Sequence, residues 1–352
     1  MESRKVSRYA AASLIVLLVA AEIAAAQPVS HDWTSYFQLR YTYSEDDGGY
    51  VSLRRLKLYG TGPAFGRWNY YLQFLYKTGN RSSTDGLFLQ EANIFRALRR
   101  GRVTFGQFKP PFGLERFTSD WKLALIDRTQ PTDRLIPNGS VGNSFARDYG
   151  LQWEGPIGRD LSLSLGLFAG GAANEPLDNG GPLLVGRAAY ERRLASDRQV
   201  RFELAASWRR DRGIDFSRQL PGAPSGYSDF AGHDIRQNLA LACDAGPDSL
   251  RAEYFSAHYR SAVHSVPSMD AMGYYLQYAR VLSKRWAVAA RYERFDPNRA
   301  VVDSKDFSWL SLGTSRFIRG DFEKVQINYV FKAERTKESD NDALLVQYQR
   351  FL

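Results

Sequence analysis

The sequence contains a single cysteine, Cys243, among its 352 residues. One cysteine cannot form an intramolecular disulfide, so the chain does not belong to the small exported domains that disulfides hold together. Cys243 follows an alternating segment that ends at Ala242, and we interpret it as an ordinary residue beside a turn.

Long hydrophobic runs are also missing. The longest, Ala10 to Ala21, has about 12 residues, whereas a helix that spans a membrane needs about 20. Three basic residues precede this run and residues 24–26 are all alanine, an order typical of a secretory signal peptide. We therefore expect cleavage after Ala26, which leaves residues 27–352 as the mature domain. A buried core helix is the alternative interpretation of the run.

Residues that support catalysis or metal binding are scarce. The chain has four histidines, all predicted in loops or at strand ends: His31, His233, His258 and His264. Their spacing indicates neither a zinc site nor a histidine paired with a serine or carboxylate nucleophile. The segment 60–66 lacks the spacing of a dinucleotide-binding loop, and Arg319-Gly320-Asp321 lies between two alternating segments, so we interpret both as turns. We expect no enzymatic activity, no cofactor and no metal.

What the chain has in abundance is alternation of apolar and polar residues. From His31 onward, short segments alternate, most of them 8 to 11 residues long, as β-strands with two different faces do. In the first, Phe37 and Leu39 share one face, and Gln38 and Arg40 share the other. Sixteen such segments are predicted: 33–43, 50–60, 68–76, 88–96, 103–108, 149–154, 161–168, 183–190, 200–208, 235–242, 250–258, 272–279, 286–295, 308–315, 325–331 and 344–352. The facing of the second, which carries Arg54, Arg55 and Lys57, is ambiguous.

The links between these segments alternate in length. Short links at 60–66, 97–102, 155–160, 191–198, 244–249, 280–285 and 318–321 separate links that are mostly longer. Short turns on one side and long loops on the other are typical of an outer-membrane barrel, and an even strand number puts both chain ends on one side. We therefore predict an all-β fold, a 16-stranded antiparallel transmembrane β-barrel. The alternative, a soluble β-sandwich, would need two domains and a linker, and no linker is apparent.

Positive charge is in excess, with 47 Lys and Arg against 38 Asp and Glu and a net charge of +9. Because the N-terminus predicts export, anionic solutes or an anionic membrane surface explain this balance better than nucleic acid does. Many cations fall on polar strand faces or in the loop after the fifth strand. A row of them along a pore would favour anions. The candidates are Arg40, Arg55, Lys57 and Arg187 on strands, and Lys109, Arg116, Lys122, Arg128, Arg134 and Arg147 in or beside the loop. Solvated surface charge is the alternative for each.

Residues 109–146 form the longest segment without alternating hydropathy. Pro110-Pro111 near its start end a strand, because neither proline donates a backbone hydrogen bond. Three motifs resemble the phosphate-selective porin O and P family of bacterial outer-membrane channels. They are Gly-Gln-Phe-Lys-Pro-Pro-Phe-Gly-Leu-Glu at 106–115, Asp127-Arg128, and Arg-Asp-Tyr-Gly at 147–150. Arg54-Arg55 also resembles that family. Phe112, Phe117 and Trp121 suit packing of the segment against a barrel wall.

The resemblance implies a trimer of 16-stranded barrels in outer-membrane lipid, with the loop at 109–146 folded inward as a constriction. It also implies passage of phosphate or polyphosphate along a ladder of arginines and lysines. We therefore expect an outer-membrane porin for passive diffusion of small anions, with phosphate the leading candidate and no nucleic-acid partner. The alternatives are a general, weakly selective porin, and an outer-membrane barrel that is an enzyme or purely structural.

Loop cations and turn cations are expected to differ in effect. Charges in short turns are screened beyond about 8 Å at physiological ionic strength, whereas charges at a constriction act where the pore is narrowest. We expect selectivity to depend on the loop set, Lys109, Arg116, Lys122 and Arg128, and little on the turn set, Arg99, Arg100, Lys284 and Arg285.

Overall fold

The computed structural model describes residues 31–352 except 82–83, 140–145, 176–180, 218 and 338. The signal segment expected at 1–26 lies outside the described residues. Among the helices that are described, none is both long and apolar enough to cross a membrane.

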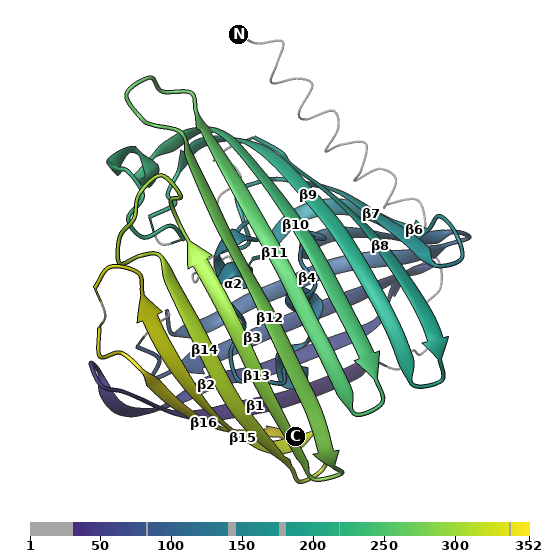
Figure 1. The fold of residues 1–352 in the computed structure, drawn as a ribbon. Coiled ribbons are helices and arrows are strands. Elements are labelled where there is room, and N and C mark those ends of the chain that lie inside the picture. The colour runs from purple at the N-terminus through teal and green to yellow at the C-terminus, as the bar shows by residue number, and fades with distance from the viewer. Residues whose placement is uncertain (1–30, 82–83, 140–145, 176–180, 218, 338) are drawn as a thin grey trace.

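The described chain forms a closed barrel in which every strand pairs antiparallel with its neighbours in sequence and β1 pairs with β16 (Figure 1). The strands are β1 (Asp32–Ser44), β2 (Gly48–Phe65), β3 (Trp68–Thr78), β4 (Gly86–Leu98), β5 (Gly101–Phe108), β6 (Asp148–Pro156), β7 (Leu161–Phe168), β8 (Leu183–Ala195), β9 (Arg198–Ile214), β10 (Phe230–Ala245), β11 (Asp248–Ser261), β12 (Met269–Ser283), β13 (Trp286–Asp296), β14 (Phe307–Phe317), β15 (Glu323–Glu334) and β16 (Ala343–Phe351). The short helices are η1 (Glu115–Phe117), η2 (Asp120–Lys122), α2 (Gln130–Leu135) and η3 (Ser225–Ser228). The predicted 16-stranded antiparallel barrel is confirmed.

The barrel is apolar outside and polar inside. On β1, Leu39 is 43% exposed and Tyr41 40%, whereas Gln38 and Arg40 between them are buried. Farther around, Leu204 is 59% exposed and its neighbour Glu203 is buried. An apolar surface of this extent is stable in lipid rather than in water, so alternation along each strand places the wall in a membrane.

Strand ends differ from the prediction where the outer face ceases to be apolar. β9 was expected to end at Trp208, but it continues through Arg209 and Asp211 to Ile214. These residues pair with the start of β10 even though their hydropathy no longer alternates. The backbone hydrogen bonds between β9 and β10 therefore continue beyond the apolar band of the outer face. Alternation in the sequence identifies only the part of each strand that lies within this band.

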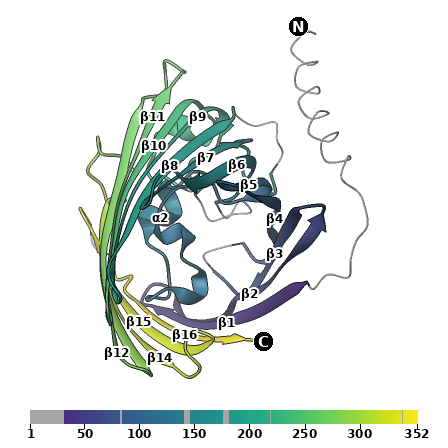
Figure 2. The same cartoon turned by 90° about the vertical axis from the view of Figure 1, so that its right-hand side faces the viewer.

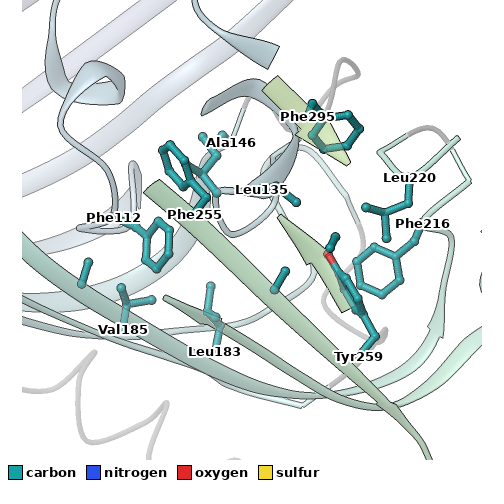
Figure 3. Close-up of a cluster of buried hydrophobic side chains, with 14 of the residues drawn as sticks. Phe112, Leu135, Ala146, Leu183, Val185, Phe216, Leu220, Phe255, Tyr259 and Phe295 are labelled. Carbon is teal, nitrogen blue, oxygen red and sulfur yellow. The ribbon is translucent and has the colours of Figure 1, made fainter. Parts of the chain in front are cut away.

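The segment between β5 and β6 turns into the barrel. Figure 2 shows α2 within the ring of strands. Pro131 of α2 lies against Gly273 of β12, where a Cβ atom would come within 2.7 Å of the proline ring, so glycine allows the close approach. Phe112, Leu135 and Phe255 belong to one buried cluster, shown in Figure 3. Part of the inner wall under the loop is therefore apolar.

Long and short links alternate around the barrel, so we predict which end faces the cell exterior. With Cys243→Ser as background, Ser225→Cys in the β9–β10 link and Ser304→Cys in the β13–β14 link should react with an impermeant thiol reagent on intact cells. Lys284→Cys in the short β12–β13 turn should react only after the outer membrane is opened. The reverse pattern would contradict the orientation. The same alternation predicts that the loop near Asp178 faces outward, but residues 176–180 lie outside the described residues.

Candidate functional site

A buried carboxylate on the barrel wall holds the start of the inward loop. Glu253 of β11 accepts hydrogen bonds from the backbone N–H groups of Leu114 and Glu115, both at 2.7 Å. The same carboxylate accepts from the Tyr275 hydroxyl at 2.8 Å and from Asn238 Nδ2 at 3.0 Å. Two backbone amides that enter the barrel without strand partners are therefore paired with a carboxyl acceptor.

A second carboxylate holds the helical part of the loop. Glu293 of β13 accepts from the backbone N–H of Gln130 at 3.2 Å, next to the start of α2. Inside the loop, the Thr129 side chain caps α2 by accepting from the backbone N–H of Thr132. The loop is thus fixed along the wall formed by β11, β12 and β13.

The tip of the loop is attached to the strands near the C-terminus. Lys324 and Gln326 of β15 donate to the Leu123 carbonyl at 3.3 and 3.2 Å. The Trp121 ring stacks on Phe322 at 5.9 Å and meets Phe351 edge-on at 5.3 Å. The loop therefore crosses the lumen from β11–β13 to the short-turn end of β15 and β16.

An open cavity of about 350 Å³ remains on the other side of the loop, against β2 and β3. Cations and aspartates line it in unequal numbers, eight against three, so its formal charge is strongly positive. The cations are Arg54, Arg55, Lys57, Lys77, Lys109, Arg116, Arg128 and Arg147, and the aspartates are Asp120, Asp127 and Asp133. The wall and the loop contribute four cations each.

A β-bulge brings two adjacent arginines into this cavity. Gln38 of β1 pairs with Arg55 of β2, but the next residue, Leu39, pairs with Leu53. Arg54 is therefore an extra residue with no partner position on β1. A bulge shifts strand alternation by one position, which allows neighbouring side chains to face the same side. This explains why the facing of residues 50–60 was ambiguous from sequence.

Two aspartates from the loop make ion pairs with the wall. Asp120 pairs with Lys57 and with Arg128, and its Oδ2 lies 3.6 Å from Arg55 Nε. Burial opposes the charge of Asp120, but Arg128 and Lys57 outweigh it and hold the pKa of its carboxyl well below the usual range.

Asp127 makes the second set of ion pairs between loop and wall. It lies 2.9 Å from Arg40 Nη1 and 4.0 Å from Arg54 Nη2. Burial again opposes the charge, and Arg40 and Arg54 lower the pKa of this carboxyl. Both aspartates are therefore charged at neutral pH.

At the base of the loop, Lys109 and Arg147 come from the two chain segments that enter and leave it. Arg147 Nη2 pairs with Glu91 Oε1 at 2.8 Å, and Lys109 Nζ donates to the Arg116 carbonyl at 3.3 Å. Burial, and after it the charge of Arg147, holds the pKa of Lys109 well below the ordinary lysine range.

The structure brings together six of the ten predicted cations around the cavity: Arg55, Lys57, Lys109, Arg116, Arg128 and Arg147. Arg40 is not among the residues that line the cavity, but it pairs with Asp127, which is. Arg187 pairs with Glu203 at 2.8 Å and lies over the Phe117 ring at 4.8 Å.

The other two predicted cations point elsewhere. Lys122 is exposed and lies over the Trp121 ring at 4.8 Å. Arg134 lies over the Phe295 ring at 5.3 Å and donates to Gln130 Oε1, toward the anchored side of the loop.

Two lining residues, Arg54 and Lys77, were absent from the predicted set. The polar face of the third strand already carried Lys77, and the pair Arg54-Arg55 was visible in the sequence. Alternation alone allowed only one of that pair to face inward. Within the described part of the chain, no three His, Cys, Asp or Glu side chains gather as metal ligands would.

Comparisons with known proteins show the family and the fold of this chain. The family model for phosphate-selective porin O and P matches residues 33–349. Porin O of Pseudomonas aeruginosa is 26% identical over 339 residues, which cover 86% of this chain and 74% of that protein. An anion-selective porin from Comamonas acidovorans superposes with a TM-score of 0.63 at 14% identity, covering 92% of this chain and all of that one. OmpT of Vibrio cholerae, in its trimer form, gives 0.60 at 8% identity, covering 93% and 100%.

The lowered pKa of Lys109 predicts a pH-dependent preference for anions. A lowered pKa means that the ammonium loses its proton below the ordinary lysine value of about 10.4, so this positive charge is lost from the cavity as the pH rises toward that value. The reversal potential in a salt gradient should drift away from anion preference over this range. Lys109→Arg keeps its charge and should drift less. Identical drift in both proteins would contradict the assignment.

Proposed function

The chain belongs to the phosphate-selective porin O and P family, and on that premise we propose that it passes small anions across the outer membrane by diffusion, with phosphate the preferred solute. Family and barrel fold indicate a channel of the bacterial outer membrane rather than an enzyme. The proposal includes export by a signal cleaved after Ala26 and assembly of residues 27–352 as a homotrimer. The OmpT trimer supports that assembly.

The observation that carries the proposal is the excess of cations in the cavity between the loop and strands β2 and β3. An anion that enters a narrow passage loses part of its hydration shell, and nearby cations compensate for that loss. Cations that enter meet the same loss together with electrostatic repulsion. The cavity therefore favours anions.

Phosphate is favoured over chloride by the kind of cation that lines the cavity. Arg54, Arg55 and Arg128 carry planar guanidinium groups, which match two oxygens of an oxyanion at once, and Lys57 adds a compact point charge. Chloride cannot accept a paired set of hydrogen bonds in this way. The similarity to Porin O and the name of the family support phosphate. Polyphosphate, with the same phosphoryl oxygens, is a second candidate solute.

The competing function is a general porin with weak selectivity. In such a pore the ion pairs of Asp120 and Asp127 would cancel most of the field of the wall cations. The eight cations against three aspartates favour the selective pore, because the lining keeps a formal excess of positive charge.

Planar bilayer recordings test the proposal. The wild-type protein should give stepwise conductance with a reversal potential on the anion side, and phosphate should reduce the chloride current by occupying the cavity. Arg55→Gln and Lys57→Gln should each move the reversal potential toward cations and weaken the block by phosphate. Arg99→Gln and Lys284→Gln, which remove the same charge from short turns, are the matched controls and should change little.

Equal shifts from the cavity pair and the turn pair would show that cavity charge does not set selectivity. A wild-type reversal potential near zero would favour the general porin. Absence of stepwise conductance would contradict a pore altogether.

A further inference from the structure

We infer that the outer wall of the barrel carries a binding site for a lipid of the outer leaflet with a phosphorylated headgroup. The site consists of a row of basic side chains on β9, β10 and β11 and of the apolar groove beside this row. It lies outside the lumen, so the inference does not depend on which solute passes through the pore. It uses the predicted orientation, in which the long links face the cell exterior.

The basic row runs across three neighbouring strands, which Figure 1 shows side by side. His233 of β10 pairs directly with Arg210 of β9 and with Arg260 of β11. Residues that pair directly across strands share one face of the sheet. Arg209 and Asp234, which precede and follow members of the row in the sequence, are buried inside the barrel. The row therefore faces outward.

The row lies where the apolar band of the wall ends. Trp208 is the outward-facing residue that precedes Arg210 on β9, and its side chain is 39% exposed. The Trp208 ring stacks on the His233 ring, with 5.8 Å between the centroids. Tryptophan is enriched at the boundary between hydrocarbon and headgroups. With the long links outside, the row lies at the depth of the outer-leaflet headgroups.

The arginines of this region are accessible to an external anion. Arg212, two residues beyond Arg210 on β9, is exposed as Arg210 is. Among the described residues, neither of these two side chains pairs with a carboxylate. Arg260 pairs with Asp270 at 2.7 Å, but its side chain remains 47% exposed. Guanidinium groups match two oxygens of a phosphate at once, and cations at this depth attract anionic headgroups.

An apolar groove of about 650 Å³ adjoins the row on the same outer face. Leu165, Leu184 and Trp208 are among the residues that line it, and Trp208 thus belongs to the groove and borders the row. A hydrocarbon chain matches such a lining, whereas an inorganic anion gains nothing from it. The groove and the row together therefore fit a lipid rather than a free phosphate ion.

The opposite wall of the barrel differs at the same end. There the outward-facing residues include Tyr43 of β1, Tyr76 of β3 and Leu87 of β4, which are 44%, 40% and 70% exposed. Such residues suit contact with acyl chains or with a second barrel. Exposed arginines suit neither contact, so the basic row identifies β9 to β11 as a wall that faces headgroups.

The experiment measures binding of fluorescent lipopolysaccharide to the purified full-length barrel in detergent. Arg210→Gln/Arg260→Gln should raise the dissociation constant roughly tenfold, because two charged contacts with phosphate are lost. The matched control is Arg192→Gln/Arg316→Gln, which removes two exposed cations from the outer wall at the short-turn end. It should change the constant by less than about twofold, because these charges are screened at that distance.

Two further measurements separate the headgroup from the acyl chain. Lipopolysaccharide whose phosphates have been removed should bind the wild-type protein as weakly as the intact lipid binds Arg210→Gln/Arg260→Gln. Gly186→Leu fills the groove, since a Cβ atom at Gly186 would meet only Leu165, at 3.5 Å. It should weaken binding of both forms of the lipid. The reversal potential of the pore should stay unchanged in all of these variants.

Several outcomes would overturn the inference. Equal binding of the two lipid forms would do so on the wild-type protein alone, even if a variant failed to fold. Equal losses in the two double variants would show attraction without a site, and displacement by an equal concentration of phosphatidylglycerol would remove the preference for the outer leaflet. Loss of the oligomer in Arg210→Gln/Arg260→Gln would make the row an interface between copies. Thiol labelling that placed the long links in the periplasm would also contradict it.

Discussion

The carboxylate of Glu253 is the interaction on which the arrangement of the pore depends. Its bonds to the backbone N–H groups of Leu114 and Glu115 draw the start of the loop to β11, and Glu293 does the same for Gln130. Losing the Glu253 acceptor would leave two buried N–H groups unsatisfied, which costs the desolvation free energy of both. Since the loop is held on this side, the open passage lies on the other, against β2 and β3.

The two sides of the inner wall therefore have different tasks. Carboxyl groups of β11 and β13 bind loop backbone, and cations of β2 face the passage, where Lys57 and Arg55 contact the loop through Asp120. Buried ion pairs contribute little net stability, since desolvation of both charges offsets their attraction. Here the ion pairs act mainly on geometry. They hold the loop at one position along the barrel wall and orient the wall cations.

Most of the barrel could be predicted from the sequence, because lipid on one side and water on the other impose alternation on every strand, as with Leu39 and Arg40. Phe112 and Trp121 were also recognisable as residues that attach the loop. The course of the loop could not be predicted, because the groups that anchor it, Glu253, Glu293 and Lys324, are more than a hundred residues away in the sequence. For the same reason nothing local separated Arg128, which faces the cavity, from Arg134, which faces Phe295. The bulge at Arg54 depends on pairing with two other strands.

The central claim is that anions pass between the loop and strands β2 and β3. Two exposed positions on the same part of the loop test it: Ser119 lines the cavity and Lys122 does not. Each is changed to cysteine in a Cys243→Ser background, and single-channel current is recorded before and after a small anionic thiol reagent is added. The added negative charge should reduce the current and the anion preference strongly at position 119 and little at position 122. A strong effect at 122 with none at 119 would contradict the account.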